Sequence, residues 1–421
     1  MPFSFSTALS GLSASSTAIG VTGNNIANAN TIGFKSGSVT FQDIFADSRG
    51  VRLNGAGAPV QVGNGVEVGA INTRLTQGSL NATNTSTTAA IQGSGFFVVR
   101  DDQAVQNYTR AGDFTVDVDG RLTTPGGQHL MGYPAQNGVI PQGATLAMIQ
   151  IPIGQTMHAV TTSDASMRIN LDRRGGTGAT FHAPVQVYDS IGKIHDLDLT
   201  YVKQADGTYQ MTASLDGNPA QTSVDGAAAS ANPVVFTFDS NGQMVSPNTL
   251  SVIPDQTQLD GATLSSINIG LHQMNPDGSM GEPVITNFAS ESAVSATSQN
   301  GFSAGIMSGI SINGDGIISA IFNNGQTQAV GQMAIANFNA QSALSHAGGN
   351  LFGETIASGQ PSIGTPGSGG RGVVVGGMLE QSNVDITSEF VDLIVAQRGF
   401  QANSRVISTI NQAMQDLLQT I

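Results

Sequence analysis

The sequence predicts an α+β multidomain protein, with a long helix at each end of the chain and mainly antiparallel β domains between them. Near both termini, apolar residues recur at alternating steps of three and four, which is the spacing of a helix face that packs against another helix. Between the two ends, apolar and polar residues alternate in short runs that stop at glycine-containing turns. We therefore expect the terminal helices to pair in a coiled-coil-like way.

The N-terminal helix is expected from about Ser6 to Asn28. Its predicted seam, the row of residues that would face a partner helix, consists of Phe5, Leu9, Leu12, Ile19 and Ile26. An asparagine-rich stretch followed by Gly33 marks the end of the helix, because Asn and Gly tolerate the left-handed backbone conformation that terminates helices. The helix is rich in Ser, Gly and Thr, so we expect it to be marginal without a partner.

The C-terminal helix is expected to begin near Asp385, where acidic residues favour the positive end of the helix dipole. Its predicted seam consists of Ile386, Phe390, Leu393, Gln397, Phe400, Ile407, Met414 and Leu418. A polar seam residue such as Gln397 lowers stability but can fix the register of packing. One such helix would indicate no more than an amphipathic helix of a globular domain. Two of them, at opposite termini, favour a subunit whose ends must find partners.

The central residues carry the signals of several β-hairpins. The segment Phe96–Val99 is a candidate buried strand, and the alternation before the Asp-Gly pair at 119–120 predicts a hairpin turn there. Three alternating runs within residues 185–215, separated by turn signals, predict a meander of at least three strands with one buried face. Further hairpins are expected around the Asn-Gly-Asp-Gly segment at 313–316.

Composition excludes several classes of function. The 421 residues carry a formal net charge of −14, so we expect no binding of nucleic acid or of an anionic membrane through bulk charge. There is no cysteine, which excludes disulfides and thiolate metal sites. No run approaches the roughly 18 apolar residues of a membrane span, so we expect no membrane insertion. Residues 1–34 also lack the basic start and the apolar core of a Sec signal, so any export would follow another route.

No catalytic, cofactor or metal site is predicted. The segment 301–305 matches the Gly-x-Ser-x-Gly pattern of a nucleophile elbow, but hairpin signals follow it where that motif needs a helix. The segment 117–120 is similar to the start of a calcium loop, yet Arg121 stands where a further oxygen ligand is required. The six histidines show no spacing typical of metal ligands. We therefore expect a protein that is not an enzyme.

Motifs at both ends and in the middle of the chain resemble those of one known family. The matching residues are Asn24, Asn25, Asn28, Gly33 and Phe34 near the N-terminus, and Ser382, Asn383, Asp385, Gln397, Arg398 and Asn403 near the C-terminus. The inner segments 95–99, 108–114 and 130–134 also match. Together they resemble the axial proteins of the bacterial flagellum, which include rod, hook and hook-associated subunits, and the resemblance covers the whole chain.

The resemblance implies an inner helical polymerisation domain, a loop-rich connector, a β domain built from two distant segments, and an outer β domain inserted into the latter. The inner helical domain would comprise residues 1–34 with 378–421, and the connector would comprise residues 35–73. The two-segment β domain would comprise residues 74–150 with 291–377, and the inserted outer domain would comprise residues 151–290. The outer region is similar to the outer domain of hook subunits and is absent from shorter rod subunits. The resemblance therefore indicates the hook branch of the family, with both seams at the polymer interface.

In that branch, a subunit polymerises into a curved hollow tube that couples the rotary motor to the filament and transmits torque. The implied partners are further copies of the chain, the hook cap, the distal rod and hook–filament junction proteins, and the flagellar type III export apparatus. The implied location is outside the cell, in the flagellum, and no cofactor is implied. Two alternatives stay open: a distal rod-type subunit enlarged by an insertion, which would form a straight tube, and a surface-exposed β-rich adhesin.

Overall fold

The computed structural model describes residues 2–44, 47–48, 61–274 and 280–419. The chain divides into two compact units. Unit 1 comprises Met1–Ile153, Gly309–Ile321 and Thr327–Ile421, and unit 2 comprises Gly154–Ser308 and Phe322–Gln326. None of the described helices has the length and the hydrophobicity needed to cross a membrane.

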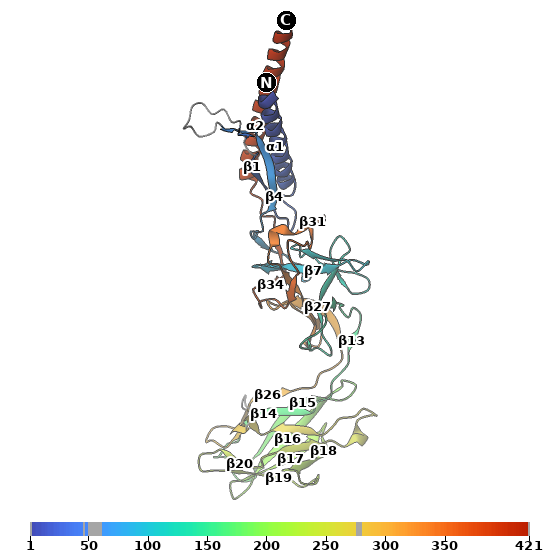
Figure 1. Cartoon of the computed structure of the whole chain (residues 1–421). Helices are drawn as coiled ribbons and strands as arrows, with labels where there is room; N and C mark the ends of the chain where they lie inside the picture. The colour runs from blue at the N-terminus through green and yellow to red at the C-terminus, as the bar shows by residue number, and fades with distance from the viewer. Residues whose placement is uncertain (1, 45–46, 49–60, 275–279, 420–421) are drawn as a thin grey trace. The chain divides into compact units, whose positions relative to one another are not determined.

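Unit 1 contains two long helices, α1 (Pro2–Ala27) and α2 (Ile386–Gln419), which lie side by side and run in opposite directions (Figure 1). Asp385 caps α2. Its Oδ1 accepts a hydrogen bond from the Thr387 amide at 3.0 Å, and its Oδ2 accepts one from the Ser388 hydroxyl at 2.9 Å. These bonds satisfy donors at the start of the helix, and they hold the pKa of Asp385 below its usual value.

The segment after α1 contains a two-stranded antiparallel ribbon of β1 (Gly37–Asp43) and β4 (Val66–Thr73). This corrects the expectation of a loop-rich connector over residues 35–73. Local sequence patterns do not predict this ribbon, because its two strands are far apart in the chain and no short turn signals a hairpin. Two short strands, β2 (Asp47–Ser48) and β3 (Gln61–Val62), also pair. Connector residues 45–46 and 49–60 lie outside the described part of the chain.

The remaining strands of unit 1 form its β domain. They are β5 (Leu80–Ala82), β6 (Ala89–Gln92), β7 (Phe96–Arg100), β8 (Gln106–Thr109), β9 (Thr115–Val116), β10 (Leu122–Thr123), β11 (His129–Pro134), β12 (Ala147–Met148), β28 (Ile317–Phe322), β29 (Thr327–Met333), β30 (Ile335–Asn337), β31 (Ser345–Gly348), β32 (Leu351–Gly353), β33 (Ser362–Gly364), β34 (Val373–Gly376) and β35 (Met378–Glu380). The main sheet runs in the order β28-β29-β11-β7-β8-β32-β31. In addition, β5 pairs with β35 and β6 pairs with β34, so segments from opposite ends of the chain pair within unit 1.

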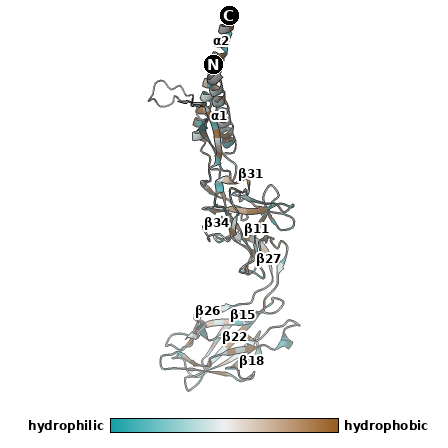
Figure 2. Ribbon diagram, in the orientation of Figure 1, coloured by the Kyte–Doolittle hydropathy of each residue, from teal (hydrophilic) through white to brown (hydrophobic). Residues whose placement is uncertain are grey.

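The centre of this β domain is hydrophobic (Figure 2). The predicted strand Phe96–Val99 is confirmed as the buried part of β7. Phe96 packs against Phe352, with ring centroids 5.3 Å apart, while Phe97 meets Phe114 edge-on at 5.2 Å. Successive side chains of a strand point to opposite faces, so β7 contributes to the core on both faces. This is why its sequence is a continuous apolar run instead of an alternating one.

Unit 2 consists mainly of strands, with one short 3-10 helix, η1 (Gln256–Gln258), among its described residues. The strands are β13 (Thr156–Met157), β14 (Asp164–Asn170), β15 (Thr180–Tyr188), β16 (Ile194–Lys203), β17 (Tyr209–Leu215), β18 (Asn218–Val224), β19 (Val234–Phe238), β20 (Met244–Ser246), β21 (Leu250–Ile253), β22 (Ile267–Gly270), β23 (His272–Met274), β24 (Met280–Pro283), β25 (Ile285–Thr286) and β26 (Ala293–Gln299). A further strand, β27 (Gly305–Ile312), begins in unit 2 and ends in unit 1. The main sheet of unit 2 runs in the order β15-β16-β17-β18-β21-β22-β14-β25. Val187 on β15 and Ile169 on β14 come from opposite ends of this strand order. Both belong to one hydrophobic core, so the sheet folds back on itself.

The predicted meander is confirmed as the antiparallel neighbours β15, β16 and β17 (Figure 1). Along β16, Leu197, Leu199 and Tyr201 are fully buried and alternate with more exposed polar residues. The next turn, Asp216-Gly217, joins β17 to β18 with φ values of +50° and +82°. A two-residue hairpin turn of this kind needs positive φ at both positions, which Asp and Gly tolerate.

The end of unit 2 differs from the predicted boundary at residue 290. Strand β26 pairs along β14, from Ala165 opposite Gln299 to Asn170 opposite Ala293. Residues 291–308 therefore belong to unit 2 and not to the β domain of unit 1. An alternating pattern predicts that a strand forms but does not say which sheet it joins, because that choice depends on side chains from distant strands.

Candidate assembly surface and terminal junction

Small residues line the face by which α1 meets α2. A Cβ added to Gly11 would lie 2.7 Å from Asn403 Nδ2, and one added to Gly399 would lie 3.2 Å from Ser15 Oγ. The two glycines therefore permit a close approach of the helices. The buried residues of α1, within its described side chains, are Ala8, Ala14, Thr22 and Asn25. The most buried side chains of α1 are thus small or polar.

The predicted N-terminal seam lies partly beside this contact face. Leu9 follows Ala8 and Leu12 follows Gly11, which is a rotation of about 100° around the helix axis for each step. The exposed fractions of Phe5 and Leu9 are 40% and 49%. The other predicted members, Leu12, Ile19 and Ile26, are half-buried. The seam therefore forms an apolar stripe on α1 that is incompletely covered, and its role in a polymer stays a prediction.

The predicted C-terminal seam is divided between covered and uncovered residues. Leu393, Phe400 and Ile407 are half-buried. The exposed fractions of Ile386, Phe390, Met414 and Leu418 are 45%, 48%, 46% and 74%, and Gln397 is also exposed. Most of the predicted seam of α2 thus faces solvent in the single chain.

A second group of exposed apolar residues on α2 lies outside the predicted seam. The exposed fractions of Val391, Ile394, Val395 and Val406 are 56%, 51%, 64% and 44%. With Ile386 and Phe390, the first three of these residues make the first turns of α2 apolar on several faces. The available signal was two adjacent apolar pairs, at 390–391 and 394–395, which exceed what one helix–helix seam requires. We call the exposed apolar residues Ile386, Phe390, Val391, Ile394 and Val395 the apolar collar.

Two asparagines of the family motif join the ends of the chain at what we call the terminal junction. Asn25 Nδ2 donates to Glu389 Oε2 at 3.0 Å, and Asn25 also exchanges two hydrogen bonds with the backbone of Gly37. Asn383 Oδ1 accepts from the Ser36 amide at 2.8 Å. Through its Nδ2, Asn383 donates to backbone carbonyls of residues 74 and 76. Both amides act as donor and acceptor between segments that are distant in sequence.

Three charged residues are buried at the same junction and form the charge cluster: Lys35, Arg110 and Glu380. Their side chains are 0%, 4% and 0% exposed. Glu380 Oε1 accepts from Lys35 Nζ and from the Gly78 amide. Arg110 Nε lies 3.1 Å from Glu380 Oε2, as an ion pair without the alignment of a hydrogen bond. Burial lowers the pKa of Lys35, and the hydrogen bond and charge of Glu380 oppose that effect.

Backbone carbonyls around the charge cluster bind further donors of its cations. Lys35 Nζ donates to the carbonyl of Thr76 at 2.8 Å, and Arg110 Nη1 donates to the carbonyls of Gly93 and Gly95 at 2.9 and 2.7 Å. One carboxylate thus neutralises two cations that backbone oxygens also hold. Buried charges are tolerated only where such partners compensate for the lost hydration.

The other motif residues occupy the ends of the helices and the surface of α2. Asn28 Nδ2 donates to the Asn24 carbonyl at 2.9 Å, and the Thr31 hydroxyl donates to Asn28 Oδ1 at 3.1 Å, which closes the last turn of α1. Phe34 is half-buried, and its carbonyl accepts from the Asn383 amide. The Ser382 hydroxyl accepts from the Val384 amide ahead of α2. Arg398 is exposed on α2, as is Gln397.

Gly33 is expected to be intolerant of substitution. Its φ is +69°, its amide donates to the Glu380 carbonyl at 2.8 Å, and a Cβ there would lie 2.5 Å from the Ala111 amide nitrogen. The left-handed conformation costs a non-glycine residue about 1–2 kcal/mol, and the backbone clash adds to this in Gly33→Ala. We expect urea unfolding to show a loss of about 2 kcal/mol or more. The control is Gly127→Ala, where φ is +84° but nothing lies within 4 Å. Equal losses in both variants would contradict the steric argument.

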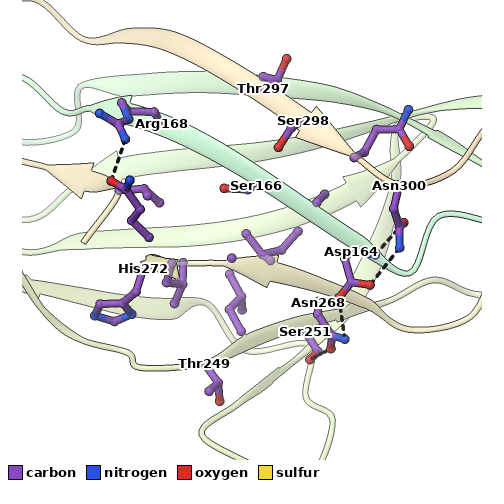
Figure 3. Close-up of a pocket in the computed structure, with 18 of the residues that line it drawn as sticks. Asp164, Ser166, Arg168, Thr249, Ser251, Asn268, His272, Thr297, Ser298 and Asn300 are labelled. Atoms are coloured by element: carbon purple, nitrogen blue, oxygen red, sulfur yellow. Dashed lines mark hydrogen bonds between the residues drawn. The ribbon is translucent and has the colours of Figure 1, made fainter. Parts of the chain in front are cut away.

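Unit 2 carries an open groove of about 800 Å³, lined by residues of β14, β22 and β26 (Figure 3). Asp164 accepts hydrogen bonds from Ser163, Asn268 and Asn300, and these hold its pKa below the usual value. Across the groove, Arg168 donates to Gln273 at 3.3 Å. The hydroxyl of Ser251 donates to Asn268 Oδ1 and so is not activated by a base. Several of the polar side chains that line the groove thus bind one another.

Family profiles match successive parts of the chain. The profile described as "Flagella basal body rod protein" matches residues 5–35, and that of the "Flagellar hook protein FlgE/F/G D1 domain" matches residues 90–165. The "Flagellar basal body protein FlaE D2 domain" matches residues 161–302. The "Flagellar basal body rod FlgEFG protein C-terminal" profile matches residues 375–420. The D2 match lies within unit 2, and the matches to the two ends cover most of both helices.

Curated relatives match along almost their whole length. The flagellar hook protein FlgE of Treponema pallidum is 34% identical, with 97% of each chain covered. FlgE of Salmonella typhimurium is 34% identical, with 99% of each chain covered. FlgE of Escherichia coli is also 34% identical, over 98% of this chain and 99% of that protein.

A solved structure shares the fold over much of the chain. The crystal structure of Helicobacter pylori flagellar hook protein FlgE2 aligns with a TM-score of 0.53 and 15% identity. The alignment covers 70% of this chain and 98% of that one. At this identity the likeness concerns the fold alone, whereas the curated relatives establish the family. The chain belongs to the FlgE family of flagellar hook proteins.

Proposed function

We propose that this chain is a structural subunit of the bacterial flagellar hook and that it polymerises through its terminal helices into a curved hollow tube. In that tube it would couple the rotary motor to the filament and transmit torque. Membership of the hook protein family supports a structural protein and not an enzyme. The observation that carries the assembly proposal is the large apolar surface that α1 and α2 leave uncovered.

The apolar collar of α2 is the strongest part of that surface. A helix that is apolar on most of its faces is stable in water only where other elements cover it. Burying a Val, Leu, Ile or Phe side chain contributes about 1.5–3 kcal/mol relative to leaving it exposed. The collar and the predicted seam of α1 together offer many such side chains, including Phe5, Leu9 and Ile394. Further copies of the same helices would supply the matching cover.

The domain roles follow from this assignment. Residues 1–34 and 378–421 would form the inner polymerisation domain, joined in a coiled-coil-like manner to neighbouring subunits. The β domain and the inserted outer domain would lie farther from the tube axis, where polar contacts can exchange as the tube bends. Within unit 2 the solvent-facing positions of β15 and β16 are largely polar or charged, which suits such contacts.

The proposed partners follow from the same role. They are further copies of the chain, the hook cap, the distal rod and hook–filament junction proteins, and the flagellar type III export apparatus. The chain would be placed outside the cell, in the flagellum. A distal rod-type subunit is less well supported, because relatives named as hook proteins match over 97–99% of the chain, including unit 2. No observation favours an adhesin.

Electron microscopy of the purified full-length chain, with or without short hook seeds, tests this proposal. We expect hollow tubes with intrinsic curvature. The control is a chain that ends before Ile386 and so lacks the apolar collar; it is expected to stay monomeric. Straight tubes would favour a rod-type subunit. Monomers alone under seeded conditions would contradict the assignment.

A further inference from the structure

A buried histidine in unit 2 lies between two carboxylates that belong to two different turns. His195, near the start of β16, is 1% exposed. Its Nδ1 is 2.6 Å from Asp216 Oδ2, and its Nε2 is 3.1 Å from Asp189 Oδ2. Asp189 is fully buried in the β15–β16 turn, while Asp216, in the β17–β18 turn, is 45% exposed.

Both carboxylates are acceptors for backbone amides as well. Asp189 Oδ1 accepts from the amides of Ile191 and Lys193, each at 2.9 Å, and so shapes the β15–β16 turn. Asp216 Oδ1 accepts from the amide of Asp196 at 2.9 Å. Both groups are therefore held as ionised acceptors. An imidazole ring can donate to two acceptors at once only when both of its nitrogens carry a proton.

The β15–β16 turn packs on the segments where the chain enters and leaves unit 2, which begins at Gly154 and whose main segment ends at Ser308. A Cβ on Gly192 would lie 2.9 Å from the Ala159 Cβ and 3.1 Å from the Ala304 amide nitrogen. These two segments, which we call the root of unit 2, are joined by backbone hydrogen bonds in both directions between residues 160 and 302, each 3.0 Å long. The turn therefore covers the paired root closely.

We propose that His195 is a protonation-dependent pin that holds the β15–β16 turn against the root of unit 2. Protonated, it bridges Asp189 and Asp216 and so ties the turn to the neighbouring hairpin. Neutral, it can donate to only one of them and presents a lone pair to the other, which loosens the turn. This inference is independent of whether the chain polymerises, because it concerns contacts within unit 2.

The other charged groups near the pin are few. Lys193 lies in the same turn, 3.7 Å from Asp260, and both side chains are largely exposed at 54% and 90%. Its charge also favours the ionised form of Asp216. Asp196 contributes its backbone amide to the network, and its side chain is exposed. On β15, the residue opposite His195 is the apolar Val187. The two carboxylates are therefore the charges in direct contact with the ring.

The electrostatic effects have definite signs. Burial alone would lower the pKa of His195, but the hydrogen bonds and charges of Asp216 and Asp189 outweigh burial and hold this pKa above its ordinary value of 6.5. Burial alone would raise the pKa of each aspartate, but hydrogen bonds from His195 and from backbone amides outweigh it and hold both below 3.8. The stabilisation from His195 is thus complete below pH 6.5 and is lost as the pH rises through the folded-state pKa. The stabilisation from the aspartates is lost as the pH falls through their lower pKa values.

Hydrogen exchange and NMR titration of the full-length monomer test the pin. We expect the ring signals of His195 to titrate above pH 6.5. The amides of Ile191, Gly192 and Lys193 should lose protection as the pH rises, after correction for intrinsic exchange. An upward pKa shift of one unit corresponds to a loss of about tenfold. In His195→Gln this pH dependence should disappear.

Two further variants separate the pin from a general loss of structure. His182→Gln is the matched control, because His182 pairs with Asp198 at 2.8 Å on the adjacent strand but is 62% exposed; the exchange of the turn should not change. Asp216→Asn changes a half-exposed residue and should fold even if His195→Gln does not. It is expected to lower the pKa of His195 and to reduce the pH-dependent loss of protection. Titration of His195 at or below pH 6.5, or the same pH dependence in every variant, would overturn the proposal.

Discussion

Replacing Ile394 with aspartate is expected to prevent assembly of the chain while leaving the monomer folded. Ile394 belongs to the apolar collar and is 51% exposed in the single chain, so its substitution removes no complete core contact. In the proposed polymer the same side chain would be buried between subunits. A carboxylate there would lose its hydration without gaining a partner, which costs several kcal/mol.

The measurement is the critical concentration for tube formation, followed by sedimentation and electron microscopy. A loss of about 2.8 kcal/mol per subunit contact corresponds to a 100-fold rise in that concentration. The matched control is Ile394→Leu, which keeps an apolar side chain of the same volume and should assemble. Circular dichroism of both variants checks that the monomer is intact. Normal tubes from Ile394→Asp would mean that the collar is not part of the polymer interface.

Replacing Glu380 with glutamine is expected to destabilise unit 1 by about 3–5 kcal/mol, because one partner of a buried ion pair is removed. The change is nearly isosteric, but it leaves the cations of Lys35 and Arg110 buried without a counter-charge. Urea unfolding followed by circular dichroism measures the loss. The control is Glu282→Gln, an exposed glutamate in unit 2, for which we expect a change within about 0.5 kcal/mol.

A double-mutant cycle sharpens this prediction. Lys35→Met removes one of the two cations and fills part of its space with an apolar side chain. The loss caused by Glu380→Gln should be smaller in the Lys35→Met background, because one unpaired charge fewer is left behind. Additive losses would show that the charge cluster does not act as a unit. A loss below about 1 kcal/mol for Glu380→Gln alone would contradict its role as the counter-charge.

The tertiary structure places some of the motif residues, including Asn25, Gly33 and Asn383, at one junction, which the motif alone did not explain. Asn25 and Asn383 come from opposite ends of the chain, and each binds backbone groups of the segments that follow α1. Gly33 lets the chain pass close to the backbone of residue 111. The terminal junction thus connects the helix pair to the β domain within unit 1. Polar residues can make such a junction specific because each unpaired buried group would be costly.

Local patterns predicted the elements whose partners are near in sequence. The meander of unit 2 could be recognised because each strand alternates and each turn carries its own signal, such as Asp216-Gly217. The ribbon of β1 and β4 was missed because its strands pair across a long connection. The boundary at 290 was placed too early for a related reason, since β26 is defined by its pairing with β14.

The amino-acid sequence by itself determined the two terminal helices, the β meander and the family, because periodicity, turn chemistry and motifs are properties of short segments. Only the tertiary structure decided which face of α1 turns toward α2. The reason is that the small glycine and alanine residues on α1 allow close approach but do not stand out in a hydrophobic pattern. The tertiary structure also decided that Lys35, Arg110 and Glu380 are buried together. Close approach and loss of hydration depend on the shapes of several segments at once, and no single segment encodes them.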